Sequence, residues 1–140
     1  MPLVAVTRLH VRSEEFLPAF FEAAFASGAE AEQATGNLSS VAVVEPDGRT
    51  FWTRTVWSDR QAMRTFMRLP GHSAAMPKLR EWCDEASVVN WEQEDSGSPS
   101  WPAAHERMQR DGRTSRVDHP SPAQETFTIP PPDLPDSDAT

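Results

Sequence analysis

The sequence has a single cysteine, Cys83, and no long apolar run. One thiol cannot form an intramolecular disulfide, and it is too few for a thiolate metal site. The first residues lead directly into an alternating pattern, without the basic start of an export signal or the length of a membrane span. We therefore expect a soluble, cytoplasmic protein with no membrane partner and no metal.

Basic residues are also scarce. Thirteen Lys and Arg stand against 21 Asp and Glu, which gives a formal net charge of -8. Binding to phosphates requires a basic face, so nucleic acid is not an expected partner. The sequence also lacks a glycine-rich phosphate loop, a nucleophile elbow, a zinc-spaced histidine pair and a dinucleotide fingerprint. No reaction can therefore be assigned from a local motif.

Proline is distributed unevenly. Eight of the 13 prolines follow Glu94, and the chain ends in acidic residues with little apolar content. Such a stretch buries too little surface to offset the entropy of ordering it. We therefore predict a domain over residues 1–94, an extended arm over 95–129 with a short helix that docks through Trp101, and a disordered acidic tail over 130–140.

Before residue 95 the hydrophobic period switches between two, which is typical of strands, and about 3.6, which is typical of helices. Pro46-Asp47-Gly48 separates two alternating runs and predicts a β-hairpin. The predicted strands are 3–11, 38–45, 50–57 and 87–93, and the predicted helices begin at Ser13, at Ser58 and at His72.

This order of elements predicts an α+β fold of the ferredoxin-like type, a split βαβ arrangement with an antiparallel sheet and helices on one face. Leu3 and Val4 point to opposite sides of the first strand, and so do Phe51 and Trp52 in the third. A sheet that is apolar on both faces needs a second cover. We expect a second copy of the chain to provide it, in a two-fold homodimer.

Several segments together are typical of an uncharacterised bacterial domain family. They are Phe16–Phe20, Phe51–Ser58, Ala62–Met63, Phe66, Gly71–His72, Ala75–Pro77, Trp82–Trp91, Gly112–Arg113 and His119–Ser121. The sequence resembles this family over most of its length. The family is itself similar to spheroidene monooxygenase and, more distantly, to the antibiotic-biosynthesis monooxygenases.

The resemblance implies a dimeric αβ-barrel with a mostly apolar pocket between sheet and helices. It implies an oxygenase that acts on an apolar small molecule, polycyclic or polyene. Members similar to spheroidene monooxygenase bind haem, whereas the antibiotic-biosynthesis enzymes oxidise polycyclic aromatics without a cofactor. Because this superfamily hosts several activities, a cofactor-free isomerase or cyclase and a non-catalytic ligand-binding protein remain alternatives.

His72 is the principal candidate for chemistry. It follows Pro70-Gly71 at a predicted helix start, where the helix dipole disfavours the imidazolium and so favours a neutral ring that acts as a base or binds haem. The alternative is a histidine that only caps the helix. We expect His72 to work in a pocket whose walls are Trp52, Met63, Phe66 and Met76.

Two further residues are candidates for orienting a polar group of the substrate. Arg54 shares a strand face with Trp52, and an arginine amid apolar surface requires a partner or a ligand. A surface or dimer-interface arginine is the alternative. His10 lies on the first strand and faces the same cavity, or it marks where that strand leaves the core. Cys83 next to Asp84 is a poor nucleophile.

Overall fold

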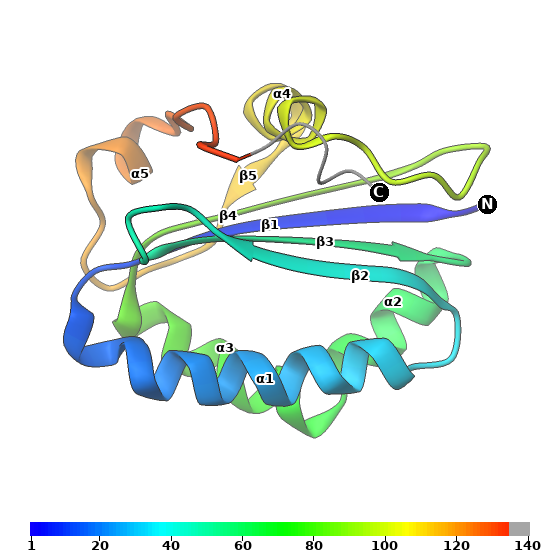
Figure 1. Ribbon diagram of the computed structural model, residues 1–140, viewed down its shortest axis with the longest axis horizontal. Helices are drawn as coiled ribbons and strands as arrows, with labels where there is room; N and C mark the ends of the chain where they lie inside the picture. Colours follow the sequence, from blue (N-terminus) through cyan, green and yellow to red (C-terminus); the bar gives the residue numbers. More distant parts are fainter. Residues whose placement is uncertain (135–140) are drawn as a thin grey trace.

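The computed structural model describes residues 1–134, and these form three layers (Figure 1). The strands are β1 (Leu3–Val11), β2 (Asn37–Val44), β3 (Thr50–Trp57), β4 (Cys83–Glu92) and β5 (Arg113–Thr114), and the helices are η1 (Glu14–Phe16), α1 (Leu17–Gln33), α2 (Arg60–Met67), α3 (Pro70–Trp82), α4 (Trp101–Asp111) and α5 (Pro122–Thr126).

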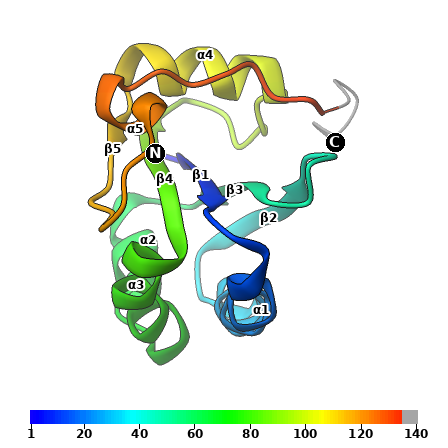
Figure 2. The same ribbon diagram turned by 90° about the vertical axis from the view of Figure 1, so that its left-hand side faces the viewer.

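The central layer is a five-stranded antiparallel sheet in the order β2-β3-β1-β4-β5. Helices α1, α2 and α3 cover one face, and α4 and α5 lie on the other (Figures 1 and 2). The predicted α+β ferredoxin-like class is confirmed. None of the helices within residues 1–134 is long and apolar enough to cross a bilayer.

The β2–β3 hairpin forms where the sequence predicts it. Asp47 Oδ1 accepts the backbone N–H groups of Arg49 and Thr50 at 2.9 and 2.8 Å, and its Oδ2 accepts the Thr50 hydroxyl at 2.6 Å. Gly48 has a φ of +73°, a conformation that glycine adopts without strain. Burial alone would raise the pKa of Asp47, but the hydrogen bonds from Thr50 and Arg49 outweigh it and lower the pKa. The turn is therefore fixed by its own side chains.

The helix starts are shifted slightly from the prediction. Asp59 caps α2 because its Oδ1 accepts the backbone N–H of Ala62 at 2.8 Å. Helix α3 begins at Pro70 rather than at His72, since proline is well suited to a first helical turn. Glu30 of α1 accepts the first backbone N–H groups of α3, including that of His72 at 3.2 Å. This contact joins α1 to the start of α3.

The helix-covered face of the sheet carries one apolar cluster at each end. The Trp57 cluster is built from Leu3, Ala31, Trp57 and Phe66. The Phe20 cluster is built from Val11, Phe20, Cys83, Ala86 and Val117. Trp57 stacks on Phe66 with ring centroids 5.1 Å apart, and Phe20 lies 4.5 Å from Phe51. The two clusters hold α1, α2 and α3 against the sheet.

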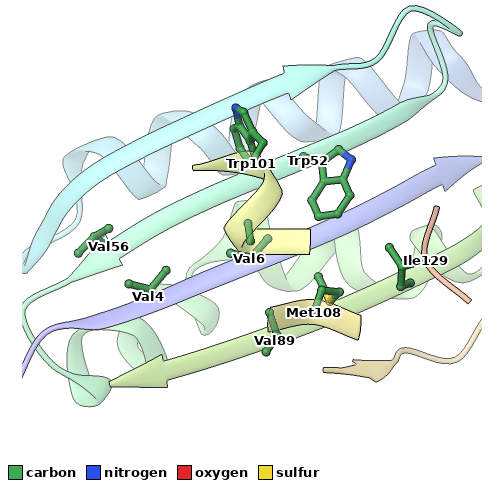
Figure 3. Packing of buried hydrophobic residues seen from close by; sticks show 9 residues of the cluster. Val4, Val6, Trp52, Val56, Val89, Trp101, Met108 and Ile129 are labelled. Carbon is green, nitrogen blue, oxygen red and sulfur yellow. The ribbon is translucent and has the colours of Figure 1, made fainter. Parts of the chain in front are cut away.

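The arm covers the opposite face of the sheet. Figure 3 shows this third cluster, which consists of Val4, Val6, Trp52, Val56, Val89, Trp101, Ala104, Met108 and Ile129. Trp101 meets Trp52 edge to face at 6.3 Å. This face therefore has its cover within the chain, from the arm rather than from the expected second copy. Trp101, Ala104 and Met108 give α4 an apolar side that covers it, so the argument for a homodimer through this face no longer holds.

Arg54 anchors the arm to the sheet. Its side chain is only 1% exposed, and Nη1 donates a hydrogen bond to the Pro99 carbonyl at 2.8 Å. Its guanidinium carbon lies 4.4 Å from the ring centroid of Trp101, a cation–π arrangement. The alternative of a surface or dimer-interface arginine is wrong, because the arm buries this side chain within one chain. Arg54 faces the arm on the same side of the sheet as Trp52, so no observation supports its predicted role in orienting a substrate beside His72.

The arm continues beyond its predicted end. Gln109 Oε1 accepts the backbone N–H of Ile129 at 2.7 Å. Further along, the backbone N–H of Asp133 donates to Glu45 Oε1 at 3.1 Å. Leu134 packs against the third cluster. The predicted disorder is therefore wrong for residues 130–134. The rest of the predicted tail, 135–140, lies outside the described residues.

Candidate functional site

Small and polar side chains line the middle of the helix-covered face of the sheet. Two neighbouring rows cross the strands there: Ser40, Thr55, Ala5 and Asn90 in one, and Ala42, Thr53, Thr7 and Val88 in the other. All eight residues are at least partly exposed, although six belong to the inner strands β1, β3 and β4. Their exposure indicates space between sheet and helices. We call this space the sheet–helix trough; the Trp57 and Phe20 clusters lie at its two ends.

The trough floor presents hydrogen-bonding groups. Thr55 Oγ1 accepts the indole N–H of Trp57 at 2.9 Å, and Asn90 Oδ1 accepts from Arg60 Nη1 at 3.0 Å. The amide nitrogen of Asn90 keeps its donor capacity, and the Thr7 hydroxyl belongs to the same floor. The floor therefore suits a ligand with hydroxyl or carbonyl groups.

His72 lies in the helix layer at the Trp57 end. Its ring packs edge-on against Phe66 at 5.1 Å, and Phe66 in turn stacks on Trp57. Nδ1 lies 3.2 Å from the Met67 carbonyl oxygen. Because a carbonyl can only accept, Nδ1 carries the proton and Nε2 keeps its lone pair. Burial lowers the pKa of His72 below its ordinary value of 6.5, against opposing effects of Met67 and Glu30. The ring is therefore a neutral base at neutral pH, and it also ties α2 to α3.

A haem bound by His72, as the resemblance implies, does not fit the surface beside this residue. The groove between α1 and α3, which begins next to it at Gly71, has a volume of about 270 Å³. Sites for small molecules usually measure roughly 300–1,000 Å³, and a porphyrin also needs apolar walls along both of its faces. The trough floor instead carries hydroxyl and amide groups. We place no haem in the chemistry of this site.

His10 lies on the opposite face of the sheet from His72. His10, Asp84 and Glu85 form a group within residues 1–134 whose potential ligand atoms all lie within 4.8 Å of one another. His10 Nδ1 is 2.6 Å from Asp84 Oδ1, but both oxygens of Glu85 are occupied, by Arg8 at 2.7 Å and by the Ser121 hydroxyl at 2.8 Å. A cation would have to displace a guanidinium, so this network is structural.

The buried pair Arg8–Glu85 should contribute strongly to stability. Burial raises the pKa of Glu85, but the hydrogen bonds from Arg8 and Ser121 outweigh it and lower the pKa, so the carboxylate is charged at neutral pH. Replacing Arg8 by Met leaves that charge buried without its partner. The free energy of unfolding measured with urea should fall by roughly 3–5 kcal/mol.

Three controls define this prediction. Arg80→Met breaks an exposed pair with Asp118, at 3.6 Å, and should change the free energy of unfolding by less than about 1 kcal/mol. Replacing Arg8 and Glu85 together by Met and Leu should recover most of the loss. The stability that the pair contributes should disappear as the pH falls through the lowered pKa of Glu85. Equal losses in Arg8→Met and Arg80→Met would contradict the prediction.

The structure separates the four predicted pocket residues. Trp52 is fully buried under the arm, and its indole N–H donates to Glu45 at 2.8 Å. Met63 and Phe66 lie on the other face of the sheet, at the Trp57 cluster. Met76 is 41% exposed. The prediction that Trp52 shares a pocket with these residues is wrong, because it belongs to the strand face that the arm covers.

Sequence reasoning missed the trough floor. Thr7, Thr53 and Thr55 lie within correctly predicted strands, on the same side as Leu3 and Phe51. The sequence does contain a signal for this floor: the strand face is apolar at both ends and polar in the middle. Cys83, by contrast, behaves as expected: burial, together with the nearby Asp84, raises the pKa of its thiol to about 12, so it is not a nucleophile at neutral pH.

Solved structures share this fold. SnoaB, a cofactor-independent oxygenase from Streptomyces nogalater, aligns with a TM-score of 0.53 and 23% identity over 67% of this chain and 94% of its own. Rv0793 from Mycobacterium tuberculosis aligns with a TM-score of 0.61 and 16% identity, over 68% and 97% of the two chains. PA3566 from Pseudomonas aeruginosa aligns with a TM-score of 0.59 and 13% identity, over 67% and 95%. At these identities the likeness establishes the fold.

The sequence itself establishes the family. No curated protein matches this chain. The family model described as antibiotic biosynthesis monooxygenase matches residues 2–78, which is more than half of the 140 residues. The matched region runs from β1 into α3, and it contains His72 and most of the trough floor. The chain therefore belongs to the antibiotic biosynthesis monooxygenase family.

Proposed function

We propose that this protein is a monooxygenase-like oxidoreductase that acts on an oxygen-bearing polycyclic small molecule in the sheet–helix trough. One observation carries the proposal: in a chain of this family, partly exposed hydroxyl and amide side chains occupy the middle of the sheet between two apolar clusters. The clusters suit the rings of such a substrate, and the floor suits its oxygen atoms.

The polar floor favours this substrate class over a polyene hydrocarbon. A polyene would displace water from Thr7, Thr53 and Asn90. It would not replace the hydrogen bonds that this water makes with the three side chains. Each polar group left unpaired in this way costs about 1–3 kcal/mol. A phenol or ketone would pair with the same groups, and such a group also acidifies a neighbouring C–H or O–H bond.

His72 suits the first chemical step, which is removal of a proton from the substrate by Nε2. The resulting anion can supply the electrons for dioxygen. A methylene group then becomes a carbonyl: R₂CH₂ and O₂ give R₂C=O and H₂O, so that one oxygen atom enters the product and the other leaves in water. The similarity in fold to SnoaB, a cofactor-independent oxygenase, supports this route.

Anthrone is a suitable probe because its methylene group lies between two aromatic rings, opposite a ketone to which those rings conjugate it, and is therefore acidic. We expect oxygen uptake above the spontaneous rate, with one anthraquinone formed for each O₂ consumed. Thr53→Val, in the trough floor, should lower kcat/KM by about fivefold, the effect of one lost hydrogen bond. Thr126→Val, at an exposed position of α5, should leave it unchanged.

The alternatives give different results in the same experiment. Binding of aromatic ligands with no oxygen uptake for any of them would indicate a ligand-binding protein. Conversion without oxygen would indicate an isomerase or cyclase. Either result would reject the oxygenase. A second copy of the chain is not needed for the trough, because one chain supplies its floor and both ends.

A further inference from the structure

Asn90 places a side-chain amide in the floor of the trough, one row from the Trp57 cluster. Glu92 follows two residues later on the same face of β4 and pairs with Leu3 of that cluster. His72 packs against a ring of the same cluster. Helices α2 and α3 lie on this side of β4 (Figure 2). The amide and the imidazole are therefore at the same end of the trough.

Arg60 fixes the orientation of this amide. Its Nη1 lies 3.0 Å from Asn90 Oδ1, and its Nη2 lies 3.6 Å from Glu92 Oε1, which holds the guanidinium over β4. A guanidinium can only donate hydrogen bonds, so the amide oxygen faces Arg60 and the NH₂ group is turned away from it. Within residues 1–134 this NH₂ group makes no hydrogen bond, and Asn90 is partly exposed. The floor therefore presents an amide donor of fixed orientation.

The contact with Arg60 also strengthens this donor. A hydrogen bond from a charged group polarises the amide, which makes its N–H groups better donors to an anion. The guanidinium is a permanent cation, so the effect does not depend on pH. The threonines of the floor offer hydroxyl groups, whose hydrogen atoms rotate to suit any partner. The amide of Asn90 is instead held in advance, and it suits an oxygen atom that becomes negative during a reaction.

Proton removal by His72 creates such an oxygen atom in the proposed substrate. As Nε2 takes a proton from the methylene group of anthrone, the electron pair of that C–H bond is delocalised through the rings onto the ketone oxygen. The step gives an enolate and an imidazolium, and it consumes no other reactant. A donor that is already in place at the developing oxyanion lowers the barrier to this step.

We propose that Asn90 binds the substrate oxygen that becomes the enolate, and that Arg60 is the positioning residue that orients and polarises its amide. The inference rests on the proposed function, because it assigns a second group to the same proton transfer. It also predicts a property that needs no turnover. The trough should bind an aromatic oxyanion more tightly than the corresponding neutral phenol.

A nitronaphthol measures this property directly, because its phenolate and its phenol absorb at different wavelengths. We expect the wild type to lower the pKa of the bound nitronaphthol below its value in water. Asn90→Ala should weaken binding of the phenolate by about tenfold or more and change binding of the phenol little. Arg60→Met should cause a smaller loss of the same kind, since the NH₂ group remains but is no longer held. Arg60→Lys keeps the charge and should recover part of that loss.

Oxygen uptake with anthrone then measures the effect on the reaction. Asn90→Ala should lower kcat by about 10²-fold, the effect of one lost oxyanion donor, and change KM little. Arg60→Lys should keep more activity than Arg60→Met. Arg64→Met is the matched control, because Arg64 lies one turn later on α2 and is exposed. It should equal the wild type in both assays, and circular dichroism should show every variant to be folded.

The outcomes separate this inference from the proposed function. If the wild type consumes oxygen but Asn90→Ala keeps its kcat and its affinity for the phenolate, the oxygenase stands and the role of Asn90 is overturned. An Arg60→Met variant that equals the wild type in both assays overturns the role of Arg60. If the wild type consumes no oxygen, the nitronaphthol decides alone. A selective loss of phenolate affinity in Asn90→Ala supports the oxyanion site, whereas equal losses for phenol and phenolate, or no binding to the wild type, overturn it.

Discussion

Ending the chain after Glu94 is expected to produce a fragment that self-associates or unfolds. Without the arm, one face of the sheet loses its cover, and the side chains of Val4, Trp52 and Val56 become exposed to water. A contiguous apolar patch of this kind does not persist on a stable monomer. Light scattering combined with size exclusion should show large species, and a hydrophobic dye should bind the fragment but not the full chain.

A single substitution tests the same contact in the full chain. Trp101 is fully buried, packs on Trp52 and stacks under the guanidinium of Arg54. Trp101→Ala should therefore lower the free energy of unfolding by about 3–5 kcal/mol, measured by urea denaturation. Met76→Ala, at an exposed position, should change it by less than about 0.5 kcal/mol.

Two outcomes would contradict these expectations. If the fragment remains a stable monomer, the arm does not protect the sheet. If Trp101→Ala costs no more than Met76→Ala, the arm contributes little to folding. A fragment that forms a well-folded dimer would have a different meaning: a second copy can replace the arm on this face, as in the barrel that the sequence resemblance implies.

The elements that the sequence predicts well are those fixed by local chemistry. Pro46-Asp47-Gly48 determines its own turn, because the Asp47 carboxylate collects three hydrogen bonds from residues that follow directly. Alternation in β1 and β3 also assigns each side chain to the correct face. Trp101 was correctly expected to dock a short helix, since the spacing of apolar residues in α4 is a local pattern.

The placement of that helix could not be predicted, because it depends on contacts between residues far apart in the chain. Proline content indicated an extended arm, yet a few apolar side chains are enough to hold it on the sheet. Arg54 illustrates the difficulty: its partners, Pro99 and Trp101, follow more than forty residues later. The candidate site has the same limitation. The helix start marks His72 as a candidate in the sequence, whereas the trough emerges only when β1, β3 and β4 are aligned.

Replacing His72 should have the largest effect on activity. Loss of a general base typically lowers kcat by about 10²- to 10⁴-fold. His72→Asn is the most informative variant, because its side-chain amide can still donate to the Met67 carbonyl but offers no basic nitrogen. We expect His72→Asn to remain folded, to show kcat lowered by this factor with anthrone, and to change KM little. Added imidazole should restore part of the activity of His72→Ala.

The pH profile separates a base from a structural histidine. Because burial lowers the pKa of His72, activity should be constant at neutral pH and fall only below the ordinary value of 6.5. The same shift means that the unfolded chain binds a proton at this residue more readily than the folded chain. The stability that neutral His72 contributes is therefore complete above pH 6.5 and decreases as the pH falls below it. If His72→Asn keeps full activity while His72→Ala is only less stable, the ring serves to join α2 to α3, and the base must be sought elsewhere around the trough.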